Sequence, residues 1–67
     1  MKSLLKICNM NTMDDVNKVR KAIANNAGVI ACEISKDRKE ANIIFDNYFV
    51  EIDDIIESIE DLGYTVL

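Results

Sequence analysis

The order of the predicted elements in this 67-residue sequence is β-α-β-β-α-β, which indicates a two-layer α+β fold. Two segments carry a single apolar stripe at helical period, and four shorter segments are predicted as strands, three of them with apolar residues at every second position. Helices with one apolar stripe each pack on the same face of one sheet. The sequence therefore predicts a single domain over residues 1–67: a ferredoxin-like sandwich with a four-stranded antiparallel sheet and two helices on one face.

The first helix is predicted over residues 14–26. Its apolar residues recur at the spacing of one helix face, namely Val16, Val19, Ala22 and Ile23. Gly28 follows shortly afterwards and is predicted to provide a left-handed cap.

The second helix is predicted from residue 52 or 53 to residue 62. It has the most regular stripe in the chain, made of Ile52, Ile55, Ile56, Ile59 and Leu62. Asp53 is the expected N-cap, and Gly63 is the expected glycine just past the C-terminal end.

Strands are predicted over residues 3–8, 29–35, 41–46 and 64–67. The residues expected to face the helices are Leu5 and Ile7, then Ile30, Cys32 and Ile34, then Ala41, Ile43 and Phe45. Two aromatic residues in the following connection, Tyr48 and Phe49, are expected to fold under the edge of the sheet.

The composition excludes several classes of function. The net charge of −4 argues against nucleic-acid binding, which depends on basic surface. No apolar run approaches the roughly 18 residues that a membrane span needs, so no direct membrane insertion is expected. The N-terminal segment is too short and too interrupted for a signal peptide, so we expect a cytoplasmic protein. The sequence has no histidine and no glycine-rich phosphate loop, so an enzyme is not expected.

The charges are distributed unevenly between the two predicted helices. Lys18 and Lys21 lie in the first helix, whereas Glu57 and Glu60 lie in the acidic second helix. Two interpretations remain open. The charges either form solvated faces of opposite sign or provide a surface for partner docking.

Several residues, in this order and spacing, resemble the heavy-metal-associated domains of copper chaperones and copper-transporting ATPases. Met10 lies at the position of the family's motif methionine, and Gly28-Val29 matches the start of the second strand. Ile59, Gly63 and Tyr64 resemble the Ile-x-x-x-Gly-Tyr ending of bacterial copper chaperones. The resemblance implies a methionine tucked into the core, a tyrosine near the metal loop, and a partner that is another such domain or a metal-transporting ATPase.

The loop at residues 9–15 departs from the family motif Gly-Met-x-Cys-x-x-Cys. Asn9 replaces the glycine, while Thr12 and Asp15 occupy the two cysteine positions. Copper(I) prefers thiolates and thioethers, so the family's copper transfer is not carried over to these oxygen donors. The same spacing is that of a capping box, in which Thr12 and Asp15 close the start of the first helix.

Two functions remain open. The preferred hypothesis is a non-metallated protein-interaction or regulatory module related to metal transport, with no cofactor. The alternative is a divergent carrier with a weakly bound metal ion. Its ligands are either copper donors at Cys8, Met10 and Met13, or oxygen donors for a divalent cation at Asn11, Asp14 and Asp15.

Overall fold

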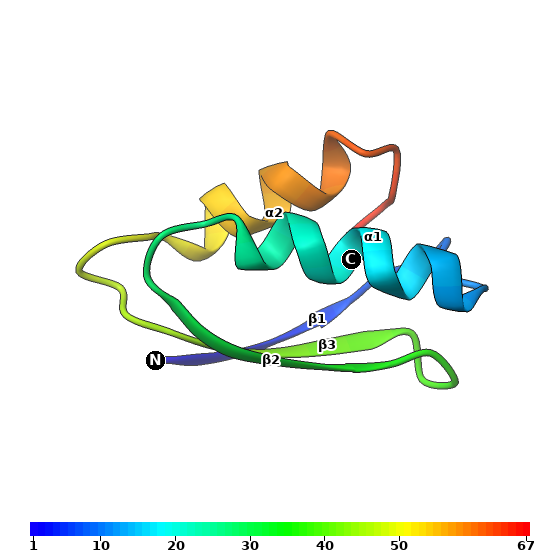
Figure 1. Ribbon diagram of the computed structural model, residues 1–67, viewed down its shortest axis with the longest axis horizontal. Helices are drawn as coiled ribbons and strands as arrows, with labels where there is room; N and C mark the ends of the chain where they lie inside the picture. Colours follow the sequence, from blue (N-terminus) through cyan, green and yellow to red (C-terminus); the bar gives the residue numbers. More distant parts are fainter.

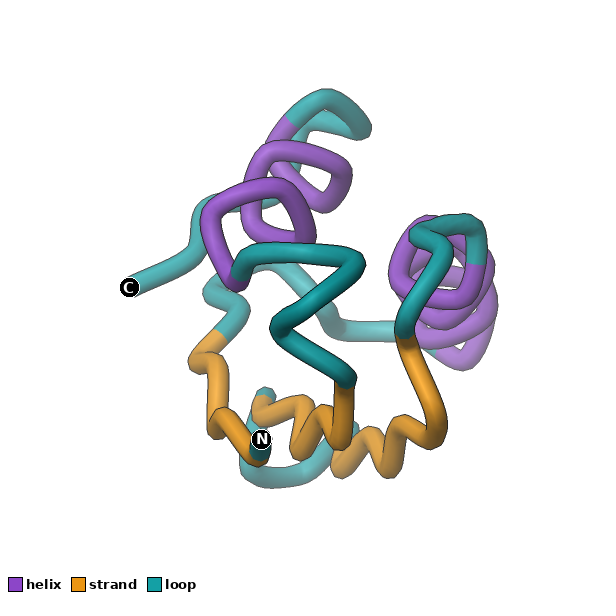
Figure 2. Tube along the Cα trace, turned by 90° about the vertical axis from the view of Figure 1, so that its left-hand side faces the viewer, coloured by secondary structure: helices purple, strands orange, loops and turns teal.

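The computed structural model describes all residues from 1 to 67. Its elements are β1 (Lys2–Lys6), α1 (Met13–Ala24), β2 (Val29–Ser35), β3 (Glu40–Phe45) and α2 (Ile52–Glu60). Both helices cover one face of the sheet, which confirms the predicted two-layer α+β architecture (Figures 1 and 2). None of the helices has the length and apolar character that crossing a membrane requires.

The sheet has three strands in the order β1-β3-β2, and both pairings are antiparallel. The prediction of a fourth strand over residues 64–67 is wrong. This tail forms one isolated bridge, between Val66 and Ile7, the residue that follows β1. Cys8 N donates to Thr65 O at 2.9 Å, and Leu67 N donates to Lys6 O at 2.9 Å. These bonds position the tail beside β1 without extending the ladder far enough to form a strand.

The core lies between the helices and the sheet, and most of it matches the predicted stripes. Its twelve buried residues are Leu5, Ile7, Met10, Val16, Val19, Ile23, Ala41, Ile43, Phe45, Val50, Ile55 and Ile59. They come from the sheet, from both helices and from the loops between them. Alternation along β1 and β3 and the 3.6-residue period of the helices therefore predicted the core correctly.

At the start of β2, the residues that face the helices differ from the prediction. The pairing with β3 is irregular between Val29 and Ala31, and such an irregularity shifts the alternation by one residue. Ile30 is consequently 69% exposed rather than buried. Beyond the irregularity the predicted alternation holds, with Cys32 and Ile34 half-buried against the core.

The two aromatic residues of the β3–α2 connection do not fold under the sheet. Tyr48 is 85% exposed and Phe49 is 67% exposed, and their rings pack edge to face at 5.0 Å. Asp46 explains this arrangement, because its carbonyl accepts from the amides of Phe49 and Val50 in a tight turn. That turn directs the smaller Val50 into the core in their place.

The helix α1 ends earlier than predicted. Its C-cap is Asn25, so Gly28 lies beyond the cap, although its φ of 101° is in the predicted left-handed region. Glycine is required there for a second reason. A Cβ at Gly28 would lie 2.9 Å from the Cβ of Phe49, so the close approach of the two connections excludes a side chain.

The helix α2 also differs from the prediction at both ends. Its N-cap is Glu51 rather than Asp53, because Asp54 reaches back and accepts from the amide of Glu51 at 3.2 Å. The helix ends at Glu60, so Leu62 lies outside it and is 50% exposed. Gly63 has a φ of 99° and is the second residue after the C-cap Asp61, whereas it was predicted to follow the helix end directly.

Candidate functional site

The loop at residues 9–15, where the resemblance places the family motif, leads into α1 at one end of the molecule (Figure 1). Met10 is fully buried, as the resemblance implied, and it anchors the loop to the core. Its neighbours Asn9, Asn11 and Thr12 are exposed. The loop is therefore held from below by one apolar side chain, while its polar residues remain free to contact each other or solvent.

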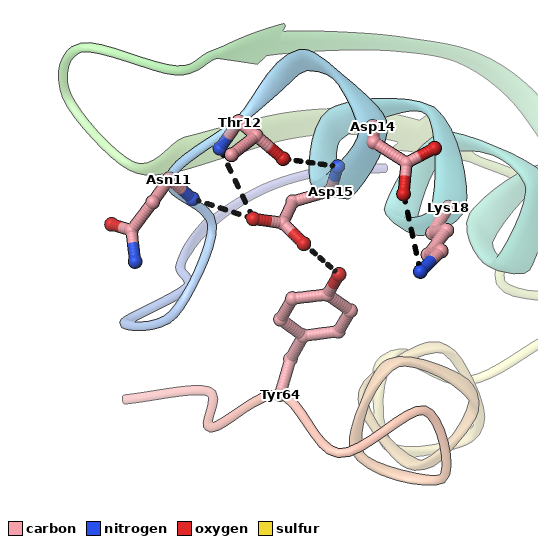
Figure 3. A network of polar contacts seen from close by, with 6 residues as sticks. All are labelled: Asn11, Thr12, Asp14, Asp15, Lys18 and Tyr64. Atoms are coloured by element: carbon pink, nitrogen blue, oxygen red, sulfur yellow. Dashed lines mark hydrogen bonds and ion pairs between the residues drawn. The ribbon is translucent and has the colours of Figure 1, made fainter.

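Thr12 and Asp15 form the predicted capping box. The Oγ1 atom of Thr12 accepts from the amide of Asp15 at 3.1 Å, and Oδ2 of Asp15 accepts from the amide of Thr12 at 3.0 Å. The same carboxylate oxygen also accepts from the amide of Asn11 at 3.0 Å (Figure 3). Three backbone amides at the loop and helix start thus have partners, which stabilises the beginning of α1.

The other carboxylate oxygen of Asp15 binds the C-terminal tail. Tyr64 donates its hydroxyl to Oδ1 at 2.6 Å, across 49 residues of sequence (Figure 3). This hydrogen bond, together with those from the amides of Asn11 and Thr12, lowers the pKa of Asp15 to about 2. The same bond, with desolvation and the nearby acidic charges, raises the pKa of Tyr64 to about 12. Asp15 is therefore ionised, and Tyr64 protonated, throughout the physiological range.

The neighbouring acid, Asp14, takes no part in this arrangement. Its side chain forms an exposed ion pair with Lys18 at 3.2 Å, directed away from Asp15 (Figure 3). Exposed pairs of this kind contribute little to stability. The two adjacent aspartates thus do not converge on one cation.

The donors considered for a copper site lie in different environments. Cys8 is half-buried, Met10 has no exposed surface, and Met13 is 58% exposed. Among histidine, cysteine, aspartate and glutamate, no three side chains are grouped so that they could hold a metal ion. Any copper site at Cys8, Met10 and Met13 would require Met10 to leave the core.

One contact at this loop could not be predicted from the sequence. The Nζ atom of Lys39, on the β2–β3 hairpin, donates to Oδ1 of Asn11 at 2.6 Å and lies 3.5 Å from the carbonyl oxygen of Cys8. The partners are separated by about 30 residues, so no local pattern reveals the pairing. The only available signal was the polar character of the hairpin.

The predicted docking residues lie on the two adjacent helices. Lys18 and Lys21 line a shallow groove of about 410 Å³ between α1 and α2, opposite Asp61. Glu57 lines a neighbouring hollow instead, and Glu60 is exposed on α2. The predicted basic and acidic docking residues therefore lie on the same helical layer, but Glu57 and Glu60 do not line the groove of Lys18 and Lys21, whose acidic residue is Asp61.

No protein-family model matches the chain, and no curated protein sequence matches it significantly. Solved structures do match. The CopZ metallochaperone superposes with a TM-score of 0.96 at 22% identity, and the match covers 100% of both chains. A copper-binding domain from HMA7, a P-type ATPase, has a TM-score of 0.93 at 29% identity, covering 98% of this chain and 89% of that one.

The yeast copper transporter domain CCC2A, solved in its apo and Cu(I)-loaded states, is also similar. It has a TM-score of 0.89 at 29% identity, covering 97% of this chain and 89% of that domain. These matches confirm the predicted resemblance to heavy-metal-associated domains, with a three-stranded sheet in this chain. The positions of Thr12 and Asp15 carry hydroxyl and carboxylate groups in that fold.

Proposed function

We propose that this chain is a module of metal transport that binds a protein partner without carrying a metal ion. The observation that carries the proposal is the state of Asp15. Both of its carboxylate oxygens accept hydrogen bonds from within the chain. The residue at the second cysteine position of the motif is thus part of the helix cap and of the contact with the tail.

The chemistry of the loop supports the absence of copper. Copper(I) binds thiolates and thioethers, whereas Thr12 and Asp15 offer a hydroxyl and a carboxylate. A harder cation would need about six oxygen ligands, and it would compete with the amides and the tyrosine hydroxyl that already contact Asp15. The amides at the start of α1 also form the positive end of the helix dipole, which disfavours a cation.

The relation to metal transport rests on the similar structures. One is a metallochaperone, another a copper-binding domain of a P-type ATPase, and a third a copper transporter domain. We infer a partner of the same kind for this chain: another heavy-metal-associated domain or a metal-transporting ATPase. Lys18 and Lys21 on α1 and Glu57 and Glu60 on α2 are the proposed contact residues, since complementary charge directs such encounters.

The proposed role is binding rather than catalysis, and it needs no cofactor. The chain has no histidine to act as a base near neutral pH. The acids Asp14 and Asp15 are engaged by Lys18 and by the cap, respectively. The cytoplasm remains our prediction for the compartment.

The direct test is a titration of the reduced protein with Cu(I) and then Zn²⁺, against a competing chelator. Backbone amide shifts report each residue, and we expect no saturable change over residues 8–16. The matched control is T12C/D15C, which restores the cysteine pair of the motif and should bind one equivalent of Cu(I). Saturable shifts of Cys8, Met10 and Met13 in the unmodified protein, abolished by Cys8→Ser, would establish the carrier function instead.

A further inference from the structure

Lys39 has the only non-glycine backbone with a positive φ in the chain, at 55°. This left-handed conformation is strained for a residue with a Cβ, and glycine or asparagine usually occupies such a position. Two backbone hydrogen bonds account for the left-handed conformation at this position. Ile7 N donates to Lys39 O at 2.7 Å, and Lys39 N donates to Lys36 O at 3.2 Å. A glycine would make the same two bonds without the strain, so the lysine side chain needs its own explanation.

That side chain reaches the motif loop. Its ammonium donates to Oδ1 of Asn11 at 2.6 Å and faces the carbonyl oxygen of Cys8 at 3.5 Å. Lys39 is half-buried, unlike the exposed Lys36 and Arg38 of the same hairpin. The hairpin and the loop lie at the same end of the molecule, on the right in Figure 1. A single side chain therefore ties together two connections that are distant in sequence.

Asn11 links this contact to the helix cap. Figure 3 shows its side chain pointing away from Asp15 while its backbone amide donates to the carboxylate of Asp15. Its Oδ1 atom accepts from the ammonium of Lys39. That carboxylate in turn accepts from Tyr64. A continuous set of hydrogen bonds runs from the hairpin through the loop and the start of α1 to the C-terminal tail.

We propose that Lys39 is the internal cation of this loop, a positioning residue whose ammonium holds residues 8–15 in one conformation without a metal ion. The charge acts through Asn11, which it orients so that its amide meets Asp15. The inference goes beyond the proposed function, because it concerns how this loop is held and not what the module binds. It requires no partner for its test.

The test compares amide hydrogen exchange in the full chain and in two single variants. Lys39→Met keeps the length of the side chain and removes the charge. We expect the amides of Asn11 and Thr12 to exchange roughly three- to tenfold faster, the range for loss of one hydrogen bond. Lys36→Met changes the same charge on the same hairpin and should leave these amides as they are. Equal exchange in Lys39→Met and the unmodified protein would overturn the proposal.

Three further measurements separate positioning from a general structural role. Lys39→Gly relieves the strain of the turn but removes the ammonium, so it should accelerate exchange in the loop as Lys39→Met does. Lys39→Arg should restore slow exchange. Asn11→Ala should accelerate exchange as much as Lys39→Met does. The double variant N11A/K39M should exchange no faster than either single variant, because both substitutions remove the same contact.

A spectroscopic signature completes the test. The ammonium protons of Lys39 should exchange with water slowly enough for detection by ¹⁵N NMR, with those of Lys36 unobserved. Loss of the Lys39 signal in Asn11→Ala would identify the contact directly. All these measurements use the metal-free protein, so failure of this inference and failure of the proposed function are distinguishable.

Discussion

The starts of the two helices have the same residue type at the same position but different surroundings. Asp15 and Asp54 each stand at the third position of their helix, and each accepts from the amide of the N-cap residue. Asp15 also accepts from the amide of Asn11 and from the hydroxyl of Tyr64. Asp54 accepts one bond, at 3.2 Å.

The difference shows how a local cap becomes a tertiary contact. A capping box needs only four consecutive residues and stabilises one helix. At α1 the free oxygen of the box binds the tail that follows α2, so helix, loop and C-terminus depend on one carboxylate. At α2 the equivalent acid stabilises its own helix alone. The following predictions test whether this asymmetry is energetic as well as geometric.

The largest effect is expected for the acids themselves. Asp15→Ala should lower the urea midpoint clearly more than Asp54→Ala, because it removes three accepted hydrogen bonds rather than one. Chemical denaturation of the two variants at pH 7 provides the comparison. Equal losses would mean that the contacts from Asn11 and Tyr64 contribute nothing to stability.

Acid should remove the same stabilisation in the unmodified protein. The pKa of Asp15 is lowered from 3.8 to about 2 in the folded state, so the unfolded chain binds more protons between these values. The contribution of Asp15 is therefore complete above about pH 4 and is lost as the pH falls toward 2. The difference in unfolding free energy between the unmodified protein and Asp15→Asn should shrink over that window, measured by urea titrations at each pH. A constant difference would contradict the lowered pKa.

A smaller effect is expected for Tyr64→Phe, which removes one of the three bonds to Asp15. This variant also tests how stability depends on pH in the alkaline range. The pKa of Tyr64 is raised from 10 to about 12, so its contribution is complete below pH 10 and is lost as the pH rises through 12. The tyrosine absorbance of the unmodified protein, minus that of Tyr64→Phe, should isolate a titration of Tyr64 near pH 12. A titration of Tyr64 near pH 10 would rule out the hydrogen bond to Asp15.

The smallest effects are expected at the N-cap of α1. Thr12→Ala should cost about 1 kcal/mol, because the amide of Asp15 loses its acceptor. Thr12→Ser keeps the hydroxyl and should be close to neutral. Thermal unfolding of the two variants distinguishes a cap from a contact of the threonine methyl group, which would make serine as costly as alanine.

A sequence pattern predicts contacts between residues that are close in sequence better than contacts between distant ones. The box at Thr12 and Asp15 was predictable because its partners are three residues apart, and the helix stripes were predictable for the same reason. The irregularity in β2 depends on pairing with β3, so the exposure of Ile30 was not predictable. Nor was the contact of Lys39 with Asn11, which joins two loops that only the folded sheet brings together.

The placement of the tail shows an intermediate case. The resemblance to copper chaperones implied that Tyr64 lies near the loop, and the hydrogen bond to Asp15 agrees with it. The same tail was wrongly expected to form a strand, and it forms a single bridge instead. Alternation establishes which side a residue faces and leaves open how many backbone bonds form.

The hydrogen bond between Lys39 and Asn11 differs from a bound metal ion in how it responds to dilution. A loop ordered by a free ion loses its order when the ion concentration falls below the dissociation constant. The ammonium of Lys39 is tethered to the same chain as its acceptor, so its effective concentration at the loop is set by the fold. Chelators, buffers and expression level leave that concentration unchanged, so the proposal that Lys39 holds this loop predicts an order that is independent of how much metal the solution contains.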